Sequence, residues 1–284
     1  MEKKINSTAD ITLEELEQLK AQGVRIITVG DGKHNRYPID KFITIKAAIS
    51  DYVKHAPHPD PSDPDAQKKV FSYIYTKMAH TVKYDETACR YSNLTGYAKD
   101  MTEDYVAAAS NLENAMLCGS AICAGYAETL RNLLAECGIN SKVISGGQVH
   151  RGDPGNGSHA WNQVQLDGEW YHCDITNDAD FILEGLAAPH FLKSTKDCTR
   201  VEKYPPKPGV ILEETGKSIG DDKQYELIEE SRTIVTDEME ARRIEAAKIA
   251  AKNAEAEKRS KRPRFVNAIL DMLEKLKGKE KGDE

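Results

Sequence analysis

The sequence predicts an α+β fold followed by a charged helical segment, and three patterns indicate this. Apolar residues recur every three or four positions over 65–82 and 123–137, which is typical of helices with one buried face. Residues 158–167 and 169–176 alternate apolar and polar side chains around Asp167-Gly168, a two-residue signal for a β-hairpin. The last part of the chain is rich in Glu, Ala, Lys and Arg, which favour a long exposed helix.

Local signals predict the elements that precede the hairpin. Thr12 and Glu15 form a capping-box pattern at the start of a helix over 10–23, which Gly23 can end. A β-branched run over 24–29 predicts a strand. The other predicted elements are helices over 39–54, 65–82, 104–116 and 123–137 and a strand over 141–145. Pro-rich or polar residues predict loops over 55–64 and 146–157.

Charge is unevenly distributed along the 284 residues, whose net charge is −7. Residues 231–284 carry 14 basic and 11 acidic side chains, whereas residues 1–230 carry 25 and 35. The end of the chain is therefore expected to be a physically different segment, with a long helix over 222–259 and a short amphipathic one over 265–276. The overall acidic excess argues against a nucleic-acid-binding protein.

Composition also bears on location and on metal binding. No run of about 18 apolar residues is present, so no membrane span is expected. The N-terminal residues lack the apolar stretch of a secretory signal, and the six irregularly spaced cysteines include no C-x-x-C pair. These features favour a reducing, cytoplasmic location. Structural zinc sites usually have short paired ligand spacings, so no metal site is expected among Cys118, Cys123, Cys137, His159 and His172.

The predicted hairpin brings a histidine close to an aspartate. With Asp167-Gly168 at the turn, Trp161 lies opposite Asp174 and His159 lies opposite Thr176, all four on one face. His159 and Asp174 then become diagonal neighbours within side-chain reach. An Asp in this position can orient the imidazole and stabilise its charged form. A turn shifted by one residue would instead move one partner to the opposite face.

Cys123 supplies the nucleophile that such a pair requires. It is expected in the first turn of the helix over 123–137, where unpaired backbone N–H groups lower the pKa of a thiol. Small neighbours at Ala121, Ala124 and Gly125 let another element approach closely. Cys123, His159 and Asp174 are therefore candidates for a thiolate–imidazolium couple oriented by a carboxylate.

Three stretches resemble motifs of the transglutaminase-like superfamily. Gly119 to Ala127 is similar to its nucleophile motif, and Ser158 to Asn162 and Gly168 to Asp174 are similar to its His and Asp motifs. Val82 to Asp85 and His190 to Ser194 resemble weaker flanking features. The resemblance covers about residues 65–205. It implies a papain-like core, with the Cys123 helix packed on an antiparallel sheet, and thiol acyl-transfer chemistry.

The expected function is that of a cysteine hydrolase of this type. Cys123 attacks a peptide or side-chain amide carbonyl, His159 protonates the leaving amine and later activates water, and Asp174 orients His159. The expected substrate is a protein or peptide, and the chemistry needs no metal or organic cofactor. The alternatives are amine transfer to protein glutamine and a catalytically silent scaffold that recruits a partner through its C-terminal helices.

The residues around this triad are open to several interpretations. Animal transglutaminases use an upstream Trp to stabilise the oxyanion, but both tryptophans here follow Cys123. The backbone N–H of Cys123 is a donor in any case. The candidate side-chain donors are Asn111, Asn114 and Tyr84. Trp161 is expected to pack beside the site and to wall the cleft. His150 and His172 are expected at the surface or in loops, and His150 is also a candidate for substrate contact.

Three parts of the chain are distinguished on this basis. Residues 1–62 are expected to pack on a catalytic core formed by residues 63–206, and residues 207–284 are expected to form a linker and a charged helical extension. The basic run from Lys258 to Arg264 leaves three interpretations for the extension. These are a solvated helix, a helix–helix or oligomer contact, and docking to an anionic surface or acidic partner.

Overall fold

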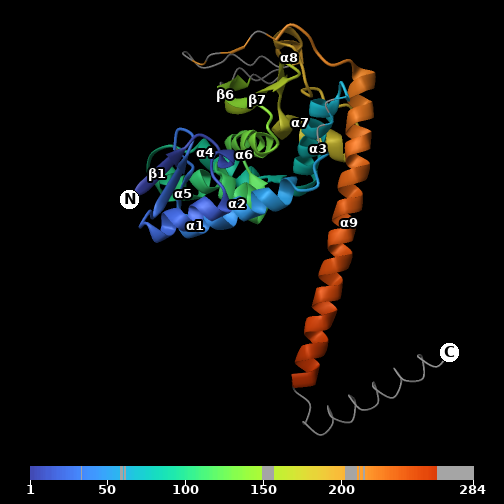
Figure 1. Ribbon diagram of the computed structural model, residues 1–284. Coiled ribbons are helices and arrows are strands. Elements are labelled where there is room, and N and C mark those ends of the chain that lie inside the picture. The colour runs from blue at the N-terminus through green and yellow to red at the C-terminus, as the bar shows by residue number, and fades with distance from the viewer. Residues whose placement is uncertain are drawn as a thin grey trace, which may run out of the picture. The chain divides into compact units, whose positions relative to one another are not determined.

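The computed structural model describes residues 1–32, 34–57, 60, 62–148, 157–201, 210, 212–213 and 215–260 (Figure 1). The chain divides into two compact units, Met1–Thr233 and Ile234–Glu284. The first unit contains every strand that the structure describes, together with Cys123, His159 and Asp174. The described residues of the second unit all belong to one helix.

Helices and short strands alternate along the first unit. In chain order they are β1 (Glu2–Ile5), the 3₁₀ turn η1 (Thr8–Asp10), α1 (Leu13–Ala21), β2 (Ile26–Val29), β3 (Arg36–Pro38), α2 (Ile39–Val53), α3 (Ala66–Thr81), β4 (Lys83–Tyr84), α4 (Glu86–Ser92), α5 (Gly96–Ala109), the π-helical turn η2 (Asn114–Cys118), β5 (Ser120–Ala121), α6 (Cys123–Glu136), β6 (Ser141–Gln148), β7 (Gly157–Leu166), β8 (Glu169–Cys173), α7 (Ile175–Leu183) and α8 (Thr195–Val201). Helix α9 (Asp221–Ser260) begins in the first unit and continues into the second.

The antiparallel sheet β6-β7-β8 carries the predicted hairpin. Leu166 lies opposite Glu169 and Gln165 opposite Trp170, so the predicted register is confirmed. Asp167 and Gly168 have φ values of 52° and 83°, the left-handed conformations that a tight hairpin turn of this kind requires. The predicted α+β arrangement is also confirmed, because α6, which begins at Cys123, packs on β6 and β7.

The second predicted strand ends earlier than its sequence pattern suggested. Strand β8 stops at Cys173, because the Asp174 side chain accepts a hydrogen bond from the Asn177 backbone and so caps α7. The prediction that Thr176 lies in a strand opposite His159 is therefore wrong, since Thr176 belongs to the first turn of α7.

Several other elements follow from the local signals. The Thr12–Glu15 capping box starts α1, and α2 and α3 occupy the predicted ranges to within one residue at each end. The helix predicted over 104–116 is displaced, because α5 ends at Ala109 and a π-helical turn follows. The short helices α4, α7 and α8 were not predicted, because they are too short to show a long periodic pattern, although Asp85 and Asp174 cap the first two.

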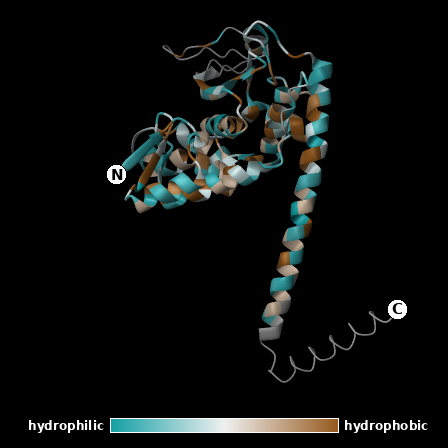
Figure 2. Ribbon diagram, in the orientation of Figure 1, coloured by the Kyte–Doolittle hydropathy of each residue, from teal (hydrophilic) through white to brown (hydrophobic). Residues whose placement is uncertain are grey.

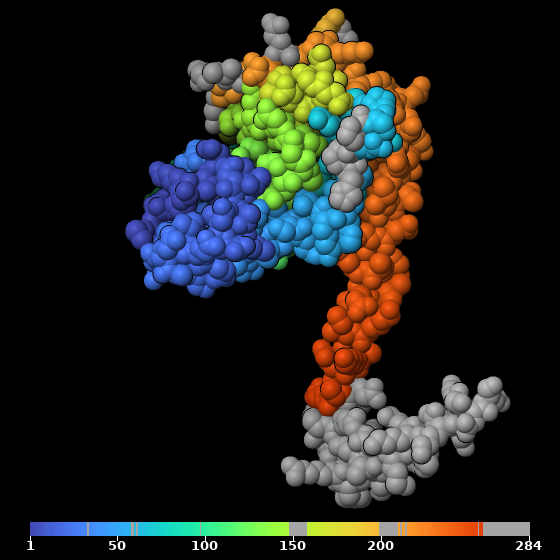
Figure 3. Space-filling view, viewed as in Figure 1, coloured from blue at the N-terminus to red at the C-terminus, as the bar shows by residue number. Residues whose placement is uncertain are grey.

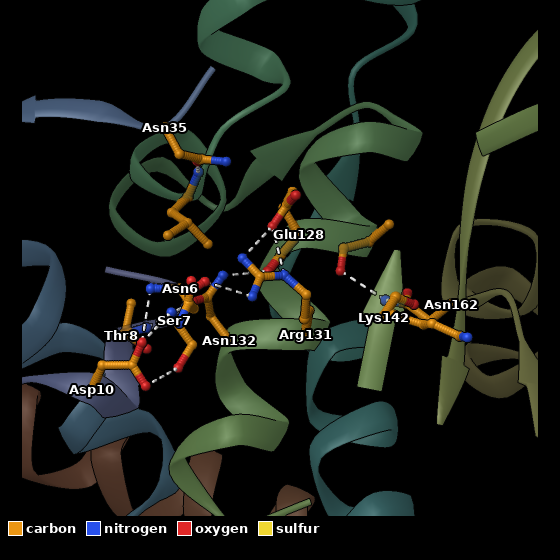
Figure 4. A network of polar contacts seen from close by, with 12 residues as sticks. Asn6, Ser7, Thr8, Asp10, Asn35, Glu128, Arg131, Asn132, Lys142 and Asn162 are labelled. Atoms are coloured by element: carbon orange, nitrogen blue, oxygen red, sulfur yellow. Dashed lines mark hydrogen bonds and ion pairs between the residues drawn. The ribbon is translucent and has the colours of Figure 1, made fainter. Parts of the chain in front are cut away.

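The N-terminal segment is attached to α6 by specific polar contacts (Figure 4). The Arg131 guanidinium donates to the Asn6 carbonyl at 2.9 Å, and the Thr8 N–H donates to the Asn132 side-chain oxygen, also at 2.9 Å. Figure 3 shows the N-terminal part of the chain, in blue, beside green parts of the chain. The N-terminal residues thus help to hold the helix that begins at Cys123.

Part of the segment expected to be a linker is bound to the core. The Glu213 N–H donates to the Gln163 side chain of β7 at 3.0 Å, and the Ser218 hydroxyl accepts from the Ser194 N–H at 2.8 Å. Within α9, Leu227 and Ile228 are 1% and 3% exposed. The first unit therefore extends beyond residue 220, and the beginning of α9 belongs to it.

The part of α9 in the second unit is mainly hydrophilic. Figure 2 shows isolated apolar residues among polar ones along it, and Met239, Ile244 and Ile249 are exposed. None of the helices in the described part of the chain is long and apolar enough to span a membrane. The predicted helix over 265–276 and the end of the basic run lie outside the described residues.

Candidate active site

Cys123 is the first residue of α6 and is half-buried. The preceding strand β5 pairs with β4, and the Ile122 N–H donates to the Ala109 carbonyl at 2.9 Å. A Cβ atom at Gly125 would lie 2.5 Å from that same carbonyl oxygen, so a glycine is needed for α5 to end this close to α6. These contacts hold the thiol at the N-terminus of α6, close to backbone N–H groups that have no partner within the helix.

His159 and Asp174 form a buried pair, as the sequence predicted. The His159 Nε2 atom lies 2.7 Å from Asp174 Oδ2, and the two residues are 6% and 2% exposed. The Asn177 side-chain amide donates to the same carboxylate oxygen at 2.7 Å. The carboxylate is thus held by the first turn of α7 while it orients the imidazole.

The surroundings of His159 favour its charged form. Burial disfavours the charged ring. The charge and the hydrogen bond of Asp174, with a further contribution from Cys123, outweigh this effect and raise the pKa of His159 to about 10. An imidazolium that contacts a thiol and a carboxylate is the arrangement expected for an ion pair with a thiolate.

Asn162 ties the histidine strand to the cysteine helix. Its buried side-chain amide donates to the Ala127 carbonyl of α6 at 2.9 Å. Asn162 lies three residues after His159 on β7, and Ala127 lies four residues after Cys123 on α6. The contact therefore fixes the two elements that carry the proposed nucleophile and base.

Trp161 lies behind the imidazole. The two rings stack with their centroids 6.2 Å apart and their planes 12° apart, and Trp161 is 2% exposed. It therefore packs beside the site as expected, but its buried side chain does not form an open cleft wall. The indole N–H donates to Nδ1 of His172, which is 3% exposed on β8. The expectation of a surface or loop position for His172 is wrong.

The candidate oxyanion donors have different surroundings. Tyr84 is half-buried; burial, its hydrogen bond with Cys89 and the charge of Cys123 raise its pKa well above the usual value. The Asn114 side-chain amide donates to the Ser120 carbonyl at 2.7 Å, and the Asn111 side chain accepts from the Asn114 N–H. The two asparagines therefore brace the segment before Cys123. His150 lies outside the described residues.

Some residues of the site were not identified from the sequence. Asn177 follows Asp174 by three residues, the spacing of a helix cap, and this signal could have identified it. Nothing local marks Asn162 as the link to α6, because its partner is distant in the sequence. Within the part of the chain that the structure describes, no group of three or more His, Cys, Asp or Glu side chains is arranged to hold a metal ion.

Comparison with known proteins places this geometry in context. Residues 47–175 match the family described as the transglutaminase-like superfamily. Among solved structures, the chain is similar to a TGase, with 19% identity, a TM-score of 0.37, and 57% of this chain and 37% of that chain covered. It is also similar to a proposed cysteine protease from Cytophaga hutchinsonii, with 14% identity, a TM-score of 0.24, and 45% and 42% covered. The chain thus spans less than half of each of these proteins. Comparison with curated proteins gave no match.

Proposed function

We propose that residues 47–175, which match the transglutaminase-like superfamily, form a thiol-dependent acyl-transfer enzyme. In this proposal it hydrolyses peptide or side-chain amide bonds with Cys123 as nucleophile, His159 as acid and base, and Asp174 as the group that orients His159. One observation carries the proposal: His159 Nε2 lies 2.7 Å from Asp174 Oδ2, and Cys123 at the start of α6 is among the groups that raise the pKa of His159.

The chemistry follows from this arrangement. The Cys123 thiolate adds to the amide carbonyl, and the backbone N–H of Cys123 is available to the developing oxyanion. The imidazolium of His159 then donates its proton to the leaving amine, which leaves a thioester and a neutral imidazole. That imidazole takes a proton from water as the water attacks the thioester. Asp174 stabilises the charged ring whenever it forms.

Thiol reactivity tests the proposal without a known substrate. Iodoacetamide labelling of each cysteine is measured by peptide mass spectrometry from about pH 5 to about pH 9. The exposed Cys118 serves as the internal reference against which the pH dependence of Cys123 labelling is compared. Cys123 should keep a nearly level rate over the same range, because its thiolate is paired with His159.

The His159→Ala variant completes this experiment. Without the imidazolium, the labelling rate of Cys123 should acquire the same pH dependence as that of Cys118. If Cys123 follows Cys118 already in the parent protein, no ion pair exists and the proposal is refuted. A catalytically silent scaffold would then be the better account of the domain.

The acceptor is the next question, because the same thioester can react with water or with an amine. We propose hydrolysis as the main reaction and protein-glutamine amine transfer as the alternative. Incubation with a glutamine-containing protein and a labelled primary amine distinguishes them. Incorporation of the label would support transfer, and release of acid or ammonia without label would support hydrolysis.

A further inference from the structure

A buried aromatic side chain connects His159 to a second histidine. The Trp161 ring stacks on His159, and its only polar group is the indole N–H. That N–H donates to Nδ1 of His172 at 3.0 Å. Because His159, Trp161 and His172 are all less than 7% exposed, water does not compete strongly for these contacts.

The hydrogen bonds of His172 define its protonation state. The indole N–H can only donate, so Nδ1 of His172 must be an acceptor and carries no proton. The neutral ring then has its proton on Nε2, which lies 3.2 Å from the Thr195 hydroxyl oxygen. Burial and the charge of Lys142 lower the pKa of His172 to about 4, which agrees with a neutral ring. A charged His172 would direct an N–H group at the indole N–H.

The far side of His172 is held in place by neighbouring segments. Thr195 bonds to Thr215 through both its backbone and its hydroxyl group. The Gln163 side-chain nitrogen lies 3.2 Å from His172 Nε2 but donates to the Glu213 carbonyl at 3.1 Å, and the Gln163 side-chain oxygen accepts from the Glu213 N–H at 3.0 Å. Gln163 therefore packs against the ring, and the Thr195 hydroxyl is the acceptor for Nε2–H. The ring is thus fixed on one side by these segments and presents Nδ1 to Trp161 on the other.

We propose that His172 is a positioning residue, which holds the Trp161 indole flat against His159 and thereby keeps the imidazole aligned between Cys123 and Asp174. This inference rests on the proposed function, because it concerns the same thiol–imidazole pair. His172 does not touch the reacting atoms. It acts through the plane of Trp161, since the hydrogen bond to Nδ1 sets the orientation of the indole and therefore the ring surface that lies against His159.

Three variants separate this role from simple packing. His172→Leu keeps an apolar side chain but removes the acceptor. His172→Asn places a carbonyl oxygen near the position of Nδ1 and is the matched conservative change. Trp161→Phe keeps a stacking ring but lacks the N–H. The measurement is the pH profile of Cys123 labelling by iodoacetamide, with Cys118 of the same molecule as reference.

The expected result is a selective change in the pH profile. In His172→Leu and Trp161→Phe, the pH above which the Cys123 labelling rate is constant should be about one unit higher than in the parent protein. At a given acidic pH, the labelling rate should then be about tenfold lower. His172→Asn should recover the parent profile to within about threefold. A merely structural role would lower the melting temperature in all three variants without this pattern.

Other outcomes overturn the inference in distinguishable ways. If His159→Ala changes the profile but His172→Leu and Trp161→Phe do not, the positioning role is refuted and the proposed function stands. If His172→Asn behaves like His172→Leu, the acceptor role is refuted. If His159→Ala itself has no effect, the thiol–imidazole pair is absent and both proposals fail. Should His172→Leu not fold, Trp161→Phe decides, because it breaks the same hydrogen bond.

Discussion

Acid sensitivity of the fold provides an independent test of the neutral state of His172. Burial, with a smaller effect of Lys142, lowers the pKa of His172 from 6.5 to about 4. The unfolded chain therefore takes up a proton on this side chain at a higher pH than the folded chain does. The contribution of His172 to stability is complete above its unfolded pKa and is lost as the pH falls toward 4.

The size of this effect follows from the difference in pKa. Lowering the pKa by about 2.5 corresponds to about 3–4 kcal/mol of unfolding free energy in full, and about 3 kcal/mol of it is lost between about pH 7 and about pH 4, where the folded ring is half-protonated. Urea unfolding followed by far-UV circular dichroism measures that free energy at about pH 7 and about pH 4. Between these two conditions the parent protein should lose about 3 kcal/mol more than His172→Asn, which has no titrating group at this position.

A matched control makes the comparison specific to the buried ring. His55 is exposed, so His55→Asn should lose as much stability on acidification as the parent protein does. The carboxylates that also titrate in this range are common to all three proteins and cancel in the differences. Equal losses in the parent and in His172→Asn would refute the argument that His172 is held neutral by burial.

Two further predictions concern packing and the extent of the first unit. Gly125→Ala places a methyl group 2.5 Å from the Ala109 carbonyl, so urea unfolding should show a loss of about 1–3 kcal/mol, whereas Gly216→Ala, where the space is open, should show almost none. A chain that ends at Thr233 should unfold cooperatively, and a chain that ends at residue 220 should be strongly destabilised, because it lacks the buried apolar residues at the start of α9. Similar melting temperatures for the two truncated chains would contradict this.

The hairpin shows how far local sequence signals reach. Asp167-Gly168 fixes a two-residue turn, the turn fixes the register, and the register places His159 and Asp174 near one another. Each step depends only on residues close in the sequence. The elements that pair across long distances, such as β1 with β2 and β4 with β5, give no comparable signal, because these strands are only two to four residues long.

The contacts that hold the site were harder to predict for a physical reason. The hydrogen bond from Asn162 to Ala127 spans 35 residues, and the contacts of Glu213 with Gln163 span 50. A polar residue with such a partner has the same local pattern as one that faces solvent. His172 illustrates this, because alternation predicts its face of the sheet but not the segments that cover that face.

Asp174 combines two roles, and its substitutions must be chosen with both in mind. Its Oδ1 atom accepts from the Asn177 N–H at the start of α7, and its Oδ2 atom binds His159. Asp174→Ala removes both contacts and should cost about 1 kcal/mol through the lost cap alone. Asparagine caps helices as well as aspartate does, so Asp174→Asn can retain the cap while it removes the charge.

Asp174→Asn should therefore separate catalysis from folding. Its carbonyl oxygen can serve the cap, which leaves the amide nitrogen facing Nε2 of His159 and removes the acceptor of the Asn177 side-chain amide. That nitrogen can only donate, so the neutral imidazole would carry its proton on Nδ1 and could not accept one from Cys123. We expect the pKa of His159 to fall, and the Cys123 labelling profile to approach that of Cys118, while the α7 cap is kept. A parent-like profile in Asp174→Asn would mean that the carboxylate does not set the tautomer of His159, and Asp174 would then be a helix cap alone.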